Sequence, residues 1–94
     1  MASNFHINFY NFGDTLFLRL SGDFNEVSAN EFVNKLTEHG TGFSHVFVDT
    51  NELSTIHSFN RNTFQKNLDT FKKQFKNFFI IGVNKHRFEQ GLEQ

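Results

Sequence analysis

The stretch VFVDTNELSTIHSFNRNTF, residues 46–64, decides the fold of this 94-residue chain. Its first half is a run of apolar, β-forming residues that ends at Asp49, and this run predicts a strand over residues 43–48 that is buried on both faces. Its second half opens a helical pattern near Asn60. The polar residues in between predict a loop, so a buried strand should lead through a hydroxyl-rich loop into a helix.

The residues before this stretch predict a β-hairpin and then a helix. Apolar and polar residues alternate over residues 5–10 and again over residues 16–20, with the turn sequence NFGD between them. Gly22 should end the second strand. A helix is expected from about Asn25 to His39, ending at the glycines of HGTG, because apolar residues recur there at helical spacing: Ala29, Phe32, Val33 and Leu36.

The residues after this stretch predict a second helix, a strand and a weak final helix. The helix should run from about Ser58 or Asn60 to Phe75, because its apolar stripe consists of Phe64, Leu68, Phe71 and Phe75. The run FFIIGV, residues 78–83, predicts another buried strand, and residues 84–94 predict the last helix. The expected fold class is α/β: one domain over residues 1–94, with a mixed, mostly parallel sheet of about four strands and two to three helices.

Composition narrows the class of protein. Fifteen phenylalanines can fill the core of a short chain, and the absence of cysteine excludes a disulfide framework or a zinc–thiolate site. No apolar run approaches the length of about 18 residues needed to cross a membrane, and the N-terminal residues do not resemble a signal peptide. We therefore expect a cytoplasmic domain with no membrane span. The lysines of residues 66–76 are expected to form the solvated face of a helix rather than a nucleic-acid interface.

Two segments resemble the STAS domain family, whose name stands for sulfate transporter and anti-sigma factor antagonist. LFLRLSGDFNEVSANEFVNKL is similar to the first strand, the Gly-plus-acidic turn and the first helix of such domains. VFVDTNELSTIHSFNRNTF is similar to the family's strand ending in Asp, loop, apolar position, Asp-Ser pair and helix, which places Asp49, Ile56 and Ser58 at the matching positions. His57 stands where the family has Asp, and Phe59-Asn60 replaces a small residue and, often, Gly.

The resemblance spans roughly residues 5–90 and implies a STAS-like fold, from which the family's last strand and helix would be missing. It also implies a function: the serine at this junction, here Ser58, is phosphorylated by a partner Ser/Thr kinase that acts as an anti-sigma factor, and a phosphatase resets it. A phosphate carries about −1.5 to −2 charge and would be tolerated near a helix N-terminus, whereas a docked partner would have to desolvate it. The expected partner-binding residues are Asp23, Asn25, Ser54, Thr55, His57, Ser58, Phe59, Asn60 and Arg61.

Other functions fit the same sequence. The chain could be a structural STAS subunit of a lipid or anion transport complex that is indifferent to phosphorylation, and Ser58 could be a plain helix N-cap. Ser54 and Thr55 are alternative phosphate acceptors. A module that binds a small ligand or a nucleotide is a third possibility. Catalysis is not expected, because no nucleophile, base and orienting group converge, and no motif indicates a metal or a cofactor.

Overall fold

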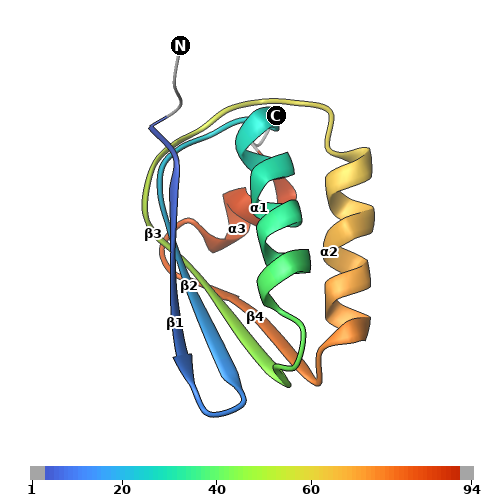
Figure 1. The fold of residues 1–94 in the computed structure, drawn as a ribbon. Coiled ribbons are helices and arrows are strands. Elements are labelled where there is room, and N and C mark those ends of the chain that lie inside the picture. The colour runs from blue at the N-terminus through green and yellow to red at the C-terminus, as the bar shows by residue number, and fades with distance from the viewer. Residues whose placement is uncertain (1–3, 92–94) are drawn as a thin grey trace.

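The computed structural model describes residues 4–91, which form a four-stranded sheet and three helices (Figure 1). The element order along the chain is β–β–α–β–α–β–α, as the sequence predicts. The bounds are His6–Phe12 (β1), Thr15–Phe24 (β2), Glu26–His39 (α1), His45–Ile56 (β3), Asn62–Gln74 (α2), Asn77–Ile81 (β4) and Lys85–Gln90 (α3).

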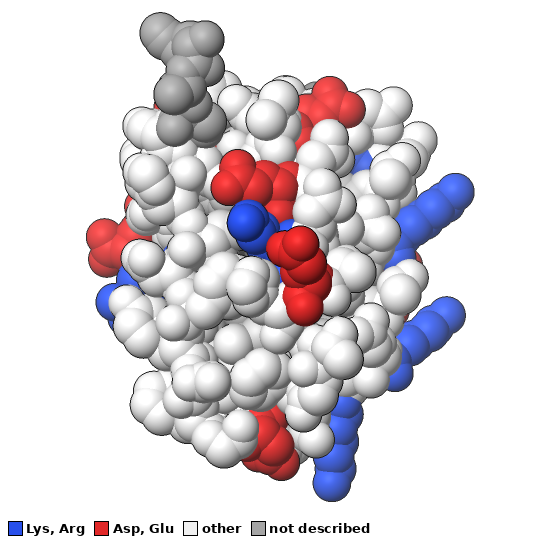
Figure 2. All heavy atoms as spheres, in the orientation of Figure 1, with Lys and Arg blue, Asp and Glu red and all other residues white. Residues whose placement is uncertain are grey.

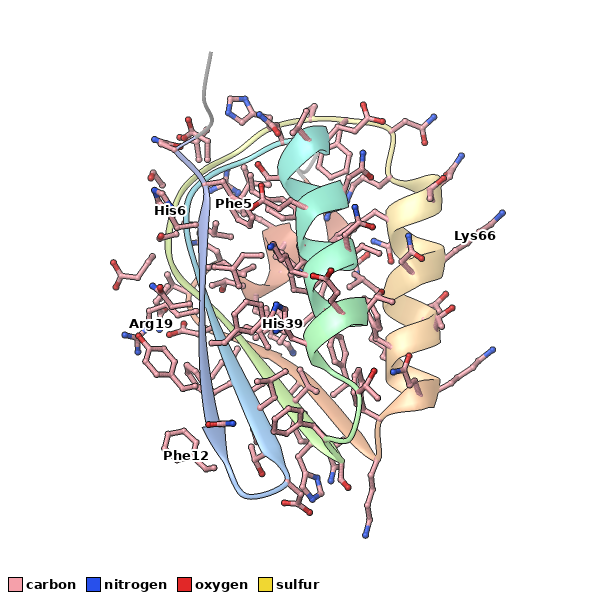
Figure 3. All side chains as sticks on the ribbon, viewed as in Figure 1. Phe5, His6, Phe12, Arg19, His39 and Lys66 are labelled. Carbon is pink, nitrogen blue, oxygen red and sulfur yellow. The ribbon has the colours of Figure 1, made fainter. Side chains whose placement is uncertain are left out.

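The sheet is mixed and mostly parallel, in agreement with the prediction. Its strand order is β1-β2-β3-β4, with β1 antiparallel to β2 and the other two pairs parallel. Helices α1 and α2 pack on one face of this sheet (Figure 1). The opposite, outer face carries Phe12 of β1 and Arg19 of β2. On the same face Phe79 of β4 is exposed and Phe47 of β3 is only half-buried, so the prediction that β3 and β4 are buried on both faces is wrong. Figure 3 shows Phe12 and Arg19 on this outer side, away from the helices.

The start of α1 is fixed by side chains that the sequence places just before it. The Asn25 side chain accepts a hydrogen bond from the Ser28 backbone N–H at 2.9 Å, which satisfies one of the free amides of the first turn. The buried Ser28 hydroxyl donates to the backbone carbonyl of Asp23 at 2.8 Å. The helix therefore runs from Glu26 to His39, close to the predicted bounds.

Strand β3 is much longer than the sequence predicts. It continues through Asp49 to Ile56, so the loop expected after Asp49 is wrong. The strand continues because β2 also extends to Phe24 and pairs with it, through two register shifts that break the alternation of buried residues. Leu53 and Ile56 are both buried although they lie three residues apart. This spacing differs from the two-residue alternation that predicts a strand from sequence.

Helix α2 begins later than expected, at Asn62 rather than Ser58 or Asn60, and its apolar stripe faces the core as predicted. Strand β4 ends at Ile81, two residues earlier than expected. The final helix, α3, spans six residues, and residues 92–94 of the predicted helix lie outside the described part of the chain.

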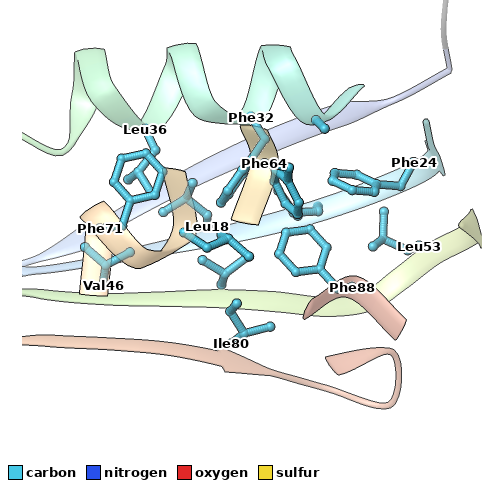
Figure 4. Packing of buried hydrophobic residues seen from close by; sticks show 14 of the residues in the cluster. Leu18, Phe24, Phe32, Leu36, Val46, Leu53, Phe64, Phe71, Ile80 and Phe88 are labelled. Carbon is cyan, nitrogen blue, oxygen red and sulfur yellow. The ribbon is translucent and has the colours of Figure 1, made fainter. Parts of the chain in front are cut away.

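Four phenylalanines from four different elements meet where β2 ends (Figure 4). Phe24 of β2 lies 5.6 Å from Phe64 of α2 and 4.8 Å from Phe88 of α3, measured between ring centroids. Phe32 of α1 completes the group at 5.5 Å from Phe88. We call these four residues the aromatic cluster. Aromatic pairs at these separations add roughly 0.5–1.5 kcal/mol each beyond the area they bury.

Gly22 is required by both its backbone conformation and its surroundings, which gives a test of the fold. Its φ is 91°, and a Cβ there would lie 2.1 Å from the Asn4 carbonyl oxygen. Gly42 has a nearly equal φ of 93°, but no atom lies within 4 Å of its Cβ position. We expect G42A to lower the free energy of unfolding by about 1–2 kcal/mol through backbone strain alone. G22A should cost at least about 1 kcal/mol more, measured by urea denaturation, and equal losses would contradict the close approach.

Candidate functional site

Residues 57–61 form a short segment without regular structure between β3 and α2 (Figure 1). It follows the end of β3 and lies at the end of the molecule where both α1 and α2 begin. The segment contains five of the nine residues predicted to bind a partner. We call it the junction segment.

Both ends of the junction segment are held by hydrogen bonds. At its start, the His57 backbone N–H donates to the Phe24 carbonyl at 2.8 Å, so the segment leaves the sheet beside the end of β2. At its end, the Asn60 side chain accepts from the Asn62 backbone N–H at 3.0 Å, which satisfies an amide of the first turn of α2. The segment is therefore anchored on both sides of Ser58.

Phe59 and Arg61 turn toward the protein interior. Phe59 is half-buried and lies 6.0 Å from Phe24 and 6.1 Å from Phe64 of the aromatic cluster. The Arg61 guanidinium lies over the Phe59 ring at 4.8 Å and over the Phe64 ring at 5.3 Å, and its Nη2 donates to the Phe88 carbonyl of α3. These contacts tie the junction segment to the core and to α3.

The Arg61 side chain is unusually desolvated for a cation. Burial lowers the pKa of its guanidinium below the usual value, although an arginine remains charged at neutral pH. Nε and Nη1 are buried and have no hydrogen-bond partner among residues 4–91. Arg61 therefore has a structural role in holding the segment, and its predicted contact with a partner stays a prediction.

Ser58, directly before Phe59, is exposed. Its hydroxyl makes no hydrogen bond to any residue that the structure describes. The interpretation of Ser58 as the N-cap of α2 is wrong, because the cap position is Arg61 and the Asn60 side chain takes the amide of Asn62. The hydroxyl is therefore open to a modifying enzyme.

The other predicted contact residues lie next to the junction segment, but in different settings. Asp23 pairs with Thr55 across β2 and β3, so the structure brings these two together although they are 32 positions apart. Ser54 and Thr55 are exposed, but they belong to β3 rather than to the expected loop. Asn25 is half-buried, and its side-chain oxygen is occupied as the cap of α1.

A hollow of about 330 Å³ adjoins the junction segment between the first turns of α1 and α2. The sequence analysis missed it, because residues from two helices meet there only after packing. Phe59 and Asn60 of the predicted site line it, together with Glu26, Ala29, Asn30, Asn62, Thr63 and Phe64. Amides and a hydroxyl around an apolar floor can receive a side chain of a docked protein.

Figure 2 shows basic side chains projecting along one edge of the molecule, while acidic and basic side chains lie side by side near the centre of this face. Lys66, Lys72, Lys73 and Lys76 are all exposed, which agrees with the solvated helix face predicted for them, and Figure 3 shows Lys66 pointing away from α2. Lys72 forms an ion pair with Glu89 of α3 at 3.6 Å. Residues 4–91 contain no group of three or more side chains suited to bind a metal, and none of the helices there is long and apolar enough to span a membrane.

Comparisons with known proteins identify the fold. An anti-sigma factor antagonist from Mycobacterium paratuberculosis has a similar structure, with a TM-score of 0.67 and 11% sequence identity over 90% of this chain and 74% of that one. An uncharacterised DUF3478-family protein with a SpoIIAA-like fold, from Shewanella loihica PV-4, has a TM-score of 0.57 and 23% identity over 87% of this chain and 71% of that one. The predicted STAS-like α/β fold is confirmed.

The fold also occurs inside a larger protein. Mglu has a TM-score of 0.66 and 19% identity over 78% of this chain, which spans only 18% of the Mglu chain. No family model and no curated protein matches the sequence. The similarity therefore lies in the three-dimensional arrangement, and at these identities it shows the fold alone.

The anchoring role of Arg61 can be tested against a neighbouring arginine. R61A removes the bond to the Phe88 carbonyl and the packing over Phe59 and Phe64, so the free energy of unfolding should fall by about 1–3 kcal/mol. R87A, at an exposed position of α3, should change it by less than about 0.5 kcal/mol. Amide exchange at His57 should accelerate only in R61A, and equal exchange in both variants would show that Arg61 does not hold the segment.

Proposed function

We propose that this chain is a non-enzymatic, protein-binding STAS-like domain whose partner binding is controlled by phosphorylation of Ser58. One observation carries the proposal: an exposed hydroxyl without a hydrogen bond, held between two anchored residues, in a chain with the fold of an anti-sigma factor antagonist. The contact surface consists of the junction segment, the hollow beside it and the ends of β2 and β3.

The geometry explains how one modification can control docking. The junction segment is fixed at His57 and Asn60, so a phosphate on Ser58 would point outward without displacing the core. The first turns of α1 and α2 carry free amides at this end of the molecule, and these favour a nearby negative charge. A partner pressed on the same surface would have to desolvate a dianion, which costs several kcal/mol. Phosphorylation therefore releases the partner and leaves the domain folded.

The partners that fit this cycle are a Ser/Thr kinase that serves as an anti-sigma factor, and a phosphatase that resets Ser58. The STAS-like fold and the exposed position of Ser58 support this proposal, which includes a bacterial, cytoplasmic setting where such a kinase uses ATP. Ser54 and Thr55 are less suited as acceptors, because both belong to a paired strand whose backbone a kinase would have to displace.

A second function has support of its own. His57 replaces the family's acidic residue, and Phe59 replaces a small residue and packs on the core. These features favour a structural STAS subunit of a lipid or anion transport complex, in which the same surface docks permanently. In that case binding would be independent of the charge at Ser58.

Phosphorylation and binding should both depend on Ser58. Incubation with ATP and the kinase encoded beside this protein should add one phosphate, seen by mass spectrometry, and S58A should remain unmodified. S58D should weaken the complex at least about 100-fold in calorimetry, because one buried, uncompensated charge costs about 3 kcal/mol or more.

S54A and T55A are the matched controls, since both hydroxyls are exposed and only a few residues from Ser58. Each should still accept the phosphate on Ser58, and because each removes only one hydroxyl of the contact surface, it should weaken the complex far less than S58D. A complex that survives S58D would support the structural subunit instead, and transfer of phosphate to S58A would refute Ser58 as the acceptor.

A further inference from the structure

Strand β4 lies at the edge of the sheet, and part of its backbone faces outward. The Asn77 N–H donates to the Ser44 carbonyl at 3.2 Å, and the Ile81 carbonyl accepts from the Thr50 hydroxyl at 2.8 Å, so these two residues direct their backbone groups toward β3. Backbone direction alternates along a strand, and the N–H and C=O groups of Phe78 and Ile80 therefore point to the free edge.

Three of the usual protections against pairing with another strand are absent from residues 77–81. Residues 77–81, NFFII, contain no charged residue, no proline and no register shift against β3. A hollow of about 470 Å³ runs beside the strand, and its lining includes the four residues Phe78 to Ile81 together with Gly82, Lys85 and Glu89. The edge is therefore open to an extended chain.

We propose that β4 pairs with β4 of a second copy of this chain, antiparallel and about a two-fold axis at Phe79. In this register Phe78 of each copy faces Ile80 of the other. Both residues have outward-directed backbone groups, so each such pair exchanges two hydrogen bonds. Phe79 then faces Phe79 of the second copy as a non-hydrogen-bonded pair, in which side chains come closest.

The sequence of the strand is complementary to a second copy of itself. The segment is uncharged, so two identical strands meet without opposing like charges. Only the axis at Phe79 keeps all five residues of both strands in the pair. An axis at Phe78 sets Ile80 against Lys76, and an axis at Ile80 sets Phe78 against Gly82, which has a φ of 106° and lies outside the strand.

The pairing also covers apolar surface on the outer face. Phe79 is 46% exposed, and its ring lies 5.4 Å from that of Phe47. Pairing brings the two Phe79 rings together and joins the two four-stranded sheets. A five-residue strand pair is small compared with standard interfaces, so we expect a reversible dimer. Because β4 pairs with residues 45–49, far along β3 from Ile56, the junction segment stays accessible in both copies.

Charge substitution at Phe79 tests both the interface and its symmetry. The full chain should show concentration-dependent dimerisation in sedimentation velocity between about 10 μM and 1 mM. F79K and F79E should each weaken self-association at least about tenfold, since each places like charges directly opposite one another. An equimolar mixture of F79K and F79E should dimerise again, because only then do opposite charges meet.

F12K is the matched control: Phe12 is 68% exposed on the outer face, but it belongs to β1 at the other edge of the sheet. It should dimerise like the unmodified chain. Amide exchange of Phe78 and Ile80 should slow as the protein concentration rises. A chain that stays monomeric at 1 mM overturns the proposal, as does a mixture of F79K and F79E that fails to associate. Loss of the dimer in F12K but not in F79K would also overturn it and place the contact on the sheet face.

Discussion

The packing of Phe24 against the other rings of the aromatic cluster is the interaction on which the rest of this structure depends. Phe24 is the last residue of β2 and is completely buried, in contact with rings from α2 and α3 and with Phe59. It fixes where the sheet ends and where both later helices pack. Because protein interiors are close-packed, a shift of one ring displaces elements that are far apart in sequence. The same residue accepts the backbone hydrogen bond that starts the junction segment.

This core gives the candidate site its rigidity. Phe59 and Arg61 hold the junction segment from inside, and Ser58, which directly precedes Phe59, stays exposed. A regulatory hydroxyl needs this combination, since a kinase must reach it while the surrounding surface keeps the shape that a partner recognises. The arrangement suits a switch that acts by adding charge rather than by unfolding. The open β4 edge lies apart from this surface, so self-association and partner binding can proceed independently.

Most elements were predictable because their signals are local. The period of apolar residues gave the positions of α1 and α2 to within a few residues, and alternation gave β1 and the first part of β2. The end of β3 was not predictable in this way. Residues 50–55 are polar except for Leu53 and were predicted as a loop, yet they form a strand because β2 offers them a partner. Local propensity is a weak guide where a neighbouring strand can satisfy the backbone.

The sequence by itself determined the α/β order, the STAS-like fold and the position of Ser58 at a strand-to-helix junction, since these depend on spacing along the chain. Only the tertiary structure decided which side chains near Ser58 are exposed and which are buried or already hydrogen-bonded. It turned Arg61 inward, and it bonded the Asn62 amide at the start of α2 to the Asn60 side chain rather than to Ser58. It also paired Asp23 with Thr55 and left one face and one edge of the sheet open. The physical reason is that burial and hydrogen bonding depend on contacts between residues that are distant in sequence. These contacts form only when all the elements pack together around one core.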